Sequence, residues 1–138
     1  MGTGTLVDTN VLLDVLTEDH LWLAWSSAAL AEAPESGPLW INPLIYAEVS
    51  ARFSRIEDLE VVLPADDFRR AQLPWEAAFL AGRAFVQYRR SGGTRTATLP
   101  DFYIGAHAAI AGVSLLTRDD SRYRTYFPTV QLITPTSS

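Results

Sequence analysis

Short apolar runs alternate with longer amphipathic segments along the chain. Four runs of mainly β-branched and apolar residues predict strands at 5–7, 39–41, 113–117 and 130–134. These runs are apolar throughout, whereas a half-exposed strand would alternate apolar and polar residues. The pattern therefore predicts strands that are covered on both faces, as in a parallel sheet.

The segments between these runs have helical spacing of apolar residues. Capping residues at Asp8-Thr9-Asn10 precede the first helix, Pro74 opens the longest one, and Gly112 ends the last. The predicted helices cover residues 11–16, 21–33, 45–56, 66–71, 75–90 and 102–111. Residues 34–38 are predicted to form a turn.

Strands that alternate with helices predict an α/β fold, a three-layer α/β/α sandwich around a central, mostly parallel sheet. The length of 138 residues fits one domain spanning 1–138, in which 135–138 form a loose tail. In such sheets, ligands bind beyond the carboxyl ends of the strands.

Composition excludes several kinds of chemistry. Cysteine is absent, so the chain has no disulfide, thiolate nucleophile or cysteine-based metal site. All eleven basic residues are Arg, which removes Schiff-base chemistry and the P-loop lysine. Of the two His, His107 lies among small residues in a predicted helix and is read as a packed or surface residue rather than a catalytic one.

Charge is distributed unevenly. Residues 1–68 hold twelve acidic residues and two Arg, a net charge of −10, whereas residues 69–138 hold four acidic residues and nine Arg, a net charge of +5. The total of −5 does not attract polyanions, but the basic half is compatible with a polyanion held on one face. The same distribution also fits a set of solvated Arg side chains.

No apolar run approaches the roughly 18 to 20 residues of a membrane span. The first ten residues lack the basic region and apolar stretch of a signal peptide. We therefore expect a cytoplasmic protein with no membrane association.

Four acidic residues stand at the expected carboxyl edge of the sheet. Asp8 directly follows the first strand, and Glu48 lies in the first turns of the helix after the second. Asp101 stands at the start of a helix, and Asp119 lies two residues past the third strand. Because the carboxyl ends of parallel strands share one edge, these side chains are expected to converge.

Converging carboxylates favour a bound cation. Two of them about 5 Å apart repel by roughly 3 kcal/mol at an effective dielectric constant of about 20. A set of oxygen ligands without Cys or His selects Mg²⁺ or Mn²⁺ over zinc. An ion held in this way can activate a water molecule and neutralise charge that develops on a phosphate.

Each acid also has a structural reading. Asp8 and Asp101 are good helix N-caps. Glu48 stands four residues before Arg52, the favourable order for a weak ion pair along a helix. Two neighbouring residues also suit a turn, Asp119 and Asp120.

Four segments carry a likeness to a known family. They are Leu-Val-Asp-Thr-Asn-Val-Leu at 6–12, Ile-Asn-Pro-Leu-Ile-Tyr-Ala-Glu at 41–48, Leu-Pro-Asp-Phe-Tyr-Ile-Gly-Ala-His-Ala at 99–108 and Leu-Leu-Thr-Arg-Asp at 115–119. Residues 122–128 fit a subgroup. In this order and at these separations, they make the chain resemble a PIN-domain protein, specifically a VapC-type toxin ribonuclease of a type II toxin–antitoxin pair.

The resemblance implies a Mg²⁺- or Mn²⁺-dependent endoribonuclease that hydrolyses RNA phosphodiester bonds. It implies that the metal is held by Asp8 and Asp101 most directly, with Glu48 and Asp119 as further ligands or water-mediated partners. Asn10 and Thr117 match polar residues that orient the carboxylates or the water. Asp120, beside Asp119, can share the latter's role.

The resemblance also implies partners. They are a homodimer and a cognate antitoxin that wraps the toxin and directs an Arg toward the acid pocket, with Trp22 and Trp25 supplying contact surface. The RNA backbone is expected to be positioned by Arg89, Arg90, Arg95, Arg118 and Arg122.

Three other interpretations remain open from sequence. The first is a PIN-domain protein that processes or binds RNA outside a toxin–antitoxin pair. The second is a receiver-like signalling domain phosphorylated at Asp8, although the chain has no lysine and no acidic pair before Asp8. The third is a structural or antitoxin-binding module, which would show no metal dependence.

Overall fold

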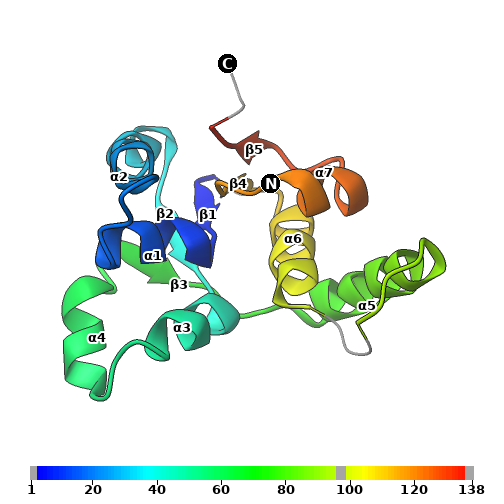
Figure 1. Cartoon of the computed structure of the whole chain (residues 1–138), viewed down its shortest axis with the longest axis horizontal. Helices are drawn as coiled ribbons and strands as arrows, with labels where there is room; N and C mark the ends of the chain where they lie inside the picture. The colour runs from blue at the N-terminus through cyan, green and yellow to red at the C-terminus, as the bar shows by residue number, and fades with distance from the viewer. Residues whose placement is uncertain (1–2, 96–98, 136–138) are drawn as a thin grey trace.

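The computed structural model describes residues 3–95 and 99–135. Within them, five strands form one sheet in the order β3-β2-β1-β4-β5, and every neighbouring pair is parallel (Figure 1). The strands are β1 Thr5–Val7, β2 Leu39–Ile41, β3 Phe68–Arg70, β4 Ser114–Leu116 and β5 Leu132–Ile133. The prediction of an α/β fold with a mostly parallel sheet is confirmed.

The sheet is doubly wound. The chain moves outward from β1 to β2 and β3, then returns to β4 and β5 on the other side of β1. Right-handed crossovers place the first connections on one face and the later ones on the other. Figure 1 shows α1 and α2 on one side of the strands and α6, with α5 outside it, on the other. The helices are α1 Thr9–Leu16, α2 Leu23–Glu32, the 3₁₀ helix η1 Ala33–Ser36, α3 Pro43–Ser50, α4 Ile56–Val62, α5 Trp75–Arg90, α6 Pro100–Ala111 and α7 Ser121–Tyr126.

The strand order also decides between two of the sequence interpretations. A receiver-like domain has the order 2-1-3-4-5. The order found here reverses direction between β1 and β4 and so places the ligand-binding crevice at the carboxyl ends of those two strands. The receiver interpretation is therefore excluded.

The core lies between the sheet and its helices. Side chains of β1 and β4 are almost completely buried, and they pack against α6 and α7, where Phe102 and Tyr123 are the largest fully buried side chains. His107 is 4% exposed, and its ring Nδ1 lies 3.0 Å from Nδ2 of Asn42, so of the two structural readings the packed one holds and the surface one does not. None of the described helices is both long and apolar enough to cross a membrane.

The helix predicted at 66–71 is wrong, because this segment contains β3. Phe68–Arg70 pairs with β2 at the edge of the sheet, and its two Arg are exposed. Edge strands are commonly short and charged, since such residues prevent pairing with other chains. A strand of this kind lacks the apolar run by which a buried strand is predicted from sequence.

The continuous helix predicted at 45–56 is also wrong. The helix α3 ends at Ser50, where the Arg52 and Phe53 backbone N–H groups bond to carbonyls three residues back, and α4 begins at Ile56. The Ser50 hydroxyl donates to the Tyr46 carbonyl at 2.6 Å, a bond that competes with the helical ladder. Apolar residues keep their helical spacing across this break. The sequence therefore predicts one helix where the structure has two.

Two further segments differ from prediction. The helix α7, Ser121–Tyr126, was not predicted, because its six residues are mostly polar. The turn predicted at 34–38 is largely the 3₁₀ helix η1, which continues α2. The loose tail predicted at 135–138 lies outside the described residues, apart from Pro135.

Candidate active site

The site is centred on Asp8, which stands where β1 ends. Its backbone N–H bonds to the Leu116 carbonyl at 2.9 Å, so it continues the ladder between β1 and β4. Its Oδ1 accepts the Thr9 N–H at 2.7 Å and caps α1. The capping role read from sequence is therefore present, but it occupies only one of the two carboxylate oxygens.

The other oxygen, Oδ2, is surrounded by side-chain donors from the far end of the chain. The hydroxyls of Thr117 and Tyr123 each donate to it at 2.9 Å, and Asn10 Nδ2 lies at 3.4 Å. Asn10 also donates to Thr117 Oγ1 at 3.2 Å and accepts the Arg118 backbone N–H at 3.3 Å. The network fixes the carboxylate of Asp8 at the crevice between β1 and β4.

Sequence reasoning missed Tyr123, although it quoted the segment that contains it. Tyr123 is 1% exposed, and burial together with the charges of Asp8, Asp101 and Glu48 raises its pKa well above the usual value for tyrosine. Of these three carboxylates, Asp8 is the one in direct contact with the Tyr123 hydroxyl. The available signal was the spacing of Tyr123 and Phe127, one helical turn apart in an otherwise polar segment.

Asp8 is costly to ionise. Only 5% of the residue is exposed, and this burial raises its pKa from 3.8 to about 6. The Tyr123 and Thr117 hydroxyls lower the pKa, and the nearby negative charge of Asp101 raises it. A buried carboxylate beside another acid is the arrangement that a cation would stabilise.

Glu48 and Asp101 reach this region from different elements. Glu48, exposed on α3, accepts the Thr9 hydroxyl at 2.6 Å and does not form the predicted pair with Arg52, which lies beyond the end of α3. Asp101 stands in the first turn of α6, where Leu99 is the N-cap residue, so the capping interpretation of Asp101 is wrong. Thr9 is the second contact that sequence reasoning did not single out.

Asp119 stands apart from these three. Its side chain is exposed, and Ser121 Oγ lies 3.5 Å from its Oδ1. Its backbone N–H donates to Thr117 Oγ1 at 3.2 Å, which helps to hold Thr117 against Asp8. Asp120 forms an ion pair with Arg124 at 2.6 Å.

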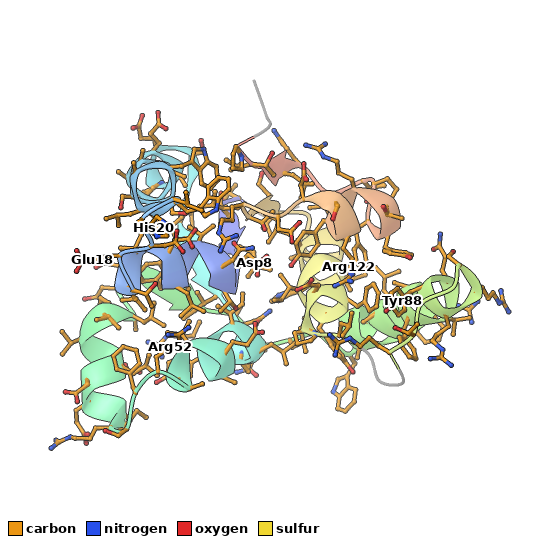
Figure 2. All side chains as sticks on the ribbon, in the orientation of Figure 1. Asp8, Glu18, His20, Arg52, Tyr88 and Arg122 are labelled. Carbon is orange, nitrogen blue, oxygen red and sulfur yellow. The ribbon has the colours of Figure 1, made fainter. Side chains whose placement is uncertain are left out.

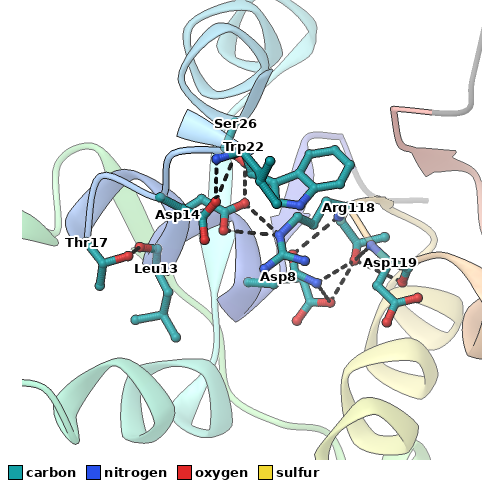
Figure 3. Close-up of polar contacts among 12 residues, drawn as sticks. Asp8, Leu13, Asp14, Thr17, Trp22, Ser26, Arg118 and Asp119 are labelled. Atoms are coloured by element: carbon teal, nitrogen blue, oxygen red, sulfur yellow. Dashed lines mark hydrogen bonds and ion pairs between the residues drawn. The ribbon is translucent and has the colours of Figure 1, made fainter. Parts of the chain in front are cut away.

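Two Arg predicted to contact RNA are used within the fold. Arg118 reaches back to Asp14, which is 2% exposed, with a distance of 2.8 Å between Nε and Oδ2, and its guanidinium lies over the ring of Trp22 (Figure 3). Asp14 also accepts the Ser26 hydroxyl at 2.7 Å. Arg118 therefore neutralises a buried charge.

Arg122 lies directly at the acid cluster. Its Nη1 is 3.1 Å from Asp101 Oδ2, and its guanidinium is 5.7 Å from the ring centroids of both Tyr88 and Phe102. In the view of Figure 2, Arg122 lies between Asp8 and Tyr88. The pocket thus already accommodates one guanidinium.

The remaining predicted Arg are Arg89 and Arg90 at the end of α5 and Arg95 in the loop that follows, and all three are exposed. Arg89 Nη1 donates to the Arg95 carbonyl at 2.6 Å and ties down the following loop. Trp22 and Trp25, expected to supply contact surface, are half-buried and pack edge to face. The most exposed tryptophan described is Trp75, at 90%.

The donor set fits a hard divalent ion, although the side chains do not enclose one as they stand. Among residues 3–95 and 99–135, no three acidic or histidine side chains are close enough to do so. Asp8, Asp101 and Glu48 supply only oxygen ligands, and Asp8 is buried with a raised pKa.

A hollow of about 560 Å³ lies at the opposite edge of the sheet from Asp8, where β2 and β3 begin. It contains Asp66 and Asp67 but none of the four predicted acids. Both aspartates of this hollow are exposed, whereas Asp8 at the other edge of the sheet is 5% exposed.

Comparison with solved structures finds the same fold in other proteins. The chain is similar to VapBC-1 from nontypeable Haemophilus influenzae, with 15% identity, a TM-score of 0.72 and coverage of 96% of this chain and 98% of the other. It is also similar to VapBC2 from Rickettsia felis bound to a promoter DNA fragment, with 13% identity, a TM-score of 0.66 and coverage of 94% and 97%. A third similar structure is FitAcB from Neisseria gonorrhoeae, with 19% identity, a TM-score of 0.63 and coverage of 95% of this chain and 97% of the other.

Comparison with curated protein sequences gives no match. The family model for the PIN domain, in contrast, matches residues 5–128, a span that includes every element from β1 to α7 and all four predicted acids. The doubly wound sheet, the Asp8 crevice and this match lead to one conclusion: the chain belongs to the PIN-domain family.

Proposed function

We propose that this protein is a toxin endoribonuclease that hydrolyses RNA phosphodiester bonds with Mg²⁺ or Mn²⁺. The observation that carries the proposal is the buried carboxylate of Asp8 at the switch point of the sheet, where it accepts the Tyr123 hydroxyl, while the neighbouring Thr9 donates to Glu48. A PIN domain with these acids in place is built for nuclease chemistry. The solved structures of similar fold are VapBC and FitAB complexes.

The proposed roles follow from position. Asp8 and Asp101 hold the ion most directly, and Glu48 and Asp119 are further ligands or partners through water. When bound, the ion supplies a Lewis acid that lowers the pKa of a water molecule and neutralises charge on the phosphate. Asn10 and Thr117 keep Asp8 in a single orientation through the bonds already described.

RNA is proposed to approach from the α5 and α7 side of this crevice. Arg122 contacts Asp101 now and is placed to transfer its guanidinium to a phosphate oxygen. The exposed Arg89, Arg90 and Arg95 lie further along the same side. Arg118 contributes indirectly, because it is committed to Asp14.

An antitoxin is the proposed protein partner. The structures of similar fold were solved as toxin–antitoxin or VapBC complexes. The contact of Arg122 with Asp101 supports a pocket that accepts a guanidinium, which is what an antitoxin Arg would present. The proposed homodimer contact is the exposed apolar end of α5, at Trp75 and Phe79.

The test is cleavage of a pool of cellular RNAs by the purified protein with Mg²⁺, with Mn²⁺ or with a chelator, followed by mapping of the cut ends. Asp8→Asn removes a charge worth several kcal/mol of transition-state stabilisation, so we expect cleavage to fall by at least about 100-fold. The matched control is Asp66→Asn, at an exposed aspartate outside the site. Cleavage that persists in Asp8→Asn, or that is unchanged by chelator, would refute the proposal.

A further inference from the structure

A groove of about 360 Å³ runs between α5 and α7 on the same side of the molecule as Arg122. Arg83, Gln87 and Arg90 line it from successive turns of α5, and Tyr126 lines it from α7. Arg83 and Arg90 are seven residues apart on one helix face, about 10 Å along the axis. They are therefore far enough apart to contact different phosphates of one strand.

The arginines of this groove are available to a ligand. Within the described part of the chain, neither Arg83 nor Arg90 forms an ion pair, and both are exposed. Arg89 and Arg122, in contrast, are bonded to the Arg95 carbonyl and to Asp101. The groove thus carries positive charge that the fold itself does not neutralise.

Aromatic side chains connect the groove with the acid site. The Arg122 guanidinium beside Asp101 lies over the Tyr88 ring, and Tyr88 packs edge to face against Tyr126 with 6.4 Å between ring centroids. Tyr126 also packs edge to face on Phe102 at 5.3 Å, which holds its ring in place at the wall of the groove. Side-chain contacts therefore lead from Asp101 through Arg122 and Tyr88 to Tyr126 at the wall of the groove.

We propose that this groove binds the single-stranded RNA that flanks the cleavage point, with Arg83 and Arg90 on phosphates and the Tyr126 ring stacked against a base. Guanidinium groups beside an aromatic ring are typical of surfaces that bind single-stranded nucleic acid without strict sequence specificity, and the amide of Gln87 adds a hydrogen-bonding group here. A duplex keeps its bases stacked inside and cannot use Tyr126. The inference rests on the proposed function and adds the path of the substrate.

The test measures fluorescence anisotropy of a labelled single-stranded RNA of 12 nucleotides, in chelator, at several salt concentrations, with every variant built on Asp8→Asn to prevent cleavage. Arg83→Gln/Arg90→Gln is expected to weaken binding at least about 10-fold and to reduce the slope of log affinity against log salt by about 1.4. Tyr126→Leu is expected to weaken binding about 5- to 100-fold without changing that slope. The matched control, Arg52→Gln/Arg55→Gln, removes two exposed arginines near the end of α3 and is expected to change affinity less than about 3-fold.

Several outcomes would overturn the inference. Equal weakening by the groove and control pairs would show a general charge effect. Equal competition by an RNA duplex of the same length would exclude single-strand binding. Unchanged RNA binding with loss of antitoxin binding would make the groove a protein interface. Groove-dependent binding in a wild-type protein that cleaves no RNA would instead retain the groove and refute the proposed function.

Discussion

At the residue scale, Asp8 caps α1 with one carboxylate oxygen and accepts hydrogen bonds from side-chain hydroxyls with the other. The residue is almost completely buried. Its raised pKa means that the folded protein holds a proton that the unfolded chain releases near pH 4. The stability due to this proton is fully present below about pH 4 and is lost as the pH rises through about 6. A neutral residue at this position would show no such loss.

We therefore predict that the pH profiles of wild type and Asp8→Asn differ. Without divalent ions, the free energy of unfolding of wild type should fall by about 2 to 3 kcal/mol relative to the variant between pH 4 and pH 7.5. Urea denaturation at several pH values, in chelator, measures this difference. Parallel profiles would contradict a pKa near 6 for Asp8. A folded Asp8→Asn at neutral pH would also show that its loss of cleavage is not unfolding.

The residues of the candidate site could be predicted from the sequence more fully than the contacts that they form. Asp8, Asn10 and Thr117 were predicted, and they do form one network, because the residue after a strand in a parallel sheet is fixed by the fold. Tyr123 was missed, because the spacing of Tyr123 and Phe127 indicates a buried helix face but not the contact with Asp8, which depends on how α7 packs. The ion pair of Arg118 with Asp14 was not predicted, because the two residues lie 104 positions apart. The contact of Arg118 with RNA stays a prediction.

At the scale of elements, the packing of α7 on α6 depends on a glycine. A Cβ added at Gly105 would lie 2.6 Å from Cε2 of Phe127 and 3.0 Å from Cδ1 of Tyr123. These distances are too short for non-bonded atoms, so the two helices approach this closely only with glycine at that position. The contact carries Tyr123 to Asp8, and it therefore connects helix packing with the site.

Gly105→Ala is predicted to destabilise the protein by about 1 to 2 kcal/mol, since overpacking costs more than the better helix propensity of alanine returns. The matched control is Gly82→Ala on α5, where nothing lies within 4 Å of an added Cβ and stability should rise by up to about 1 kcal/mol. Urea denaturation measures both changes. Two variants with equal effects would show that packing at Gly105 is not tight.

Strands and helices could be predicted from the sequence where burial produces a regular pattern of apolar residues. The apolar strands β1 and β2 and the helix α5 were predicted with the observed bounds. The edge strand β3 and the break between α3 and α4 were not, because sheet pairing and local hydrogen bonds decide them rather than apolar spacing.

At the scale of the whole molecule, α5 exposes large apolar side chains at its first turns. Trp75 is 90% exposed and Phe79, one turn later, is 74% exposed. Adjacent exposed aromatic residues of this size mark contact surfaces in soluble proteins. Nothing in their spacing distinguishes them from core residues, so the sequence alone could not show which face they occupy.

We predict that wild type self-associates through this face and that Trp75→Ser/Phe79→Ser shifts the protein toward a monomer of 15.2 kDa. Light scattering coupled to size exclusion, over a range of concentrations, measures the mass. A mass that is the same for both proteins would place the dimer contact elsewhere. Circular dichroism checks that the variant stays folded, which we expect because both side chains project into solvent.

The pairing of β1 with β4 has a consequence for synthesis in the cell. The donors on Asp8 Oδ2 from Thr117 and Tyr123 lie 109 and 115 positions later in the chain. A chain that stops short of α7 lacks Tyr123, so it cannot form the full set of donors on Asp8. The proposed nuclease site is therefore complete only after α7 has been synthesised.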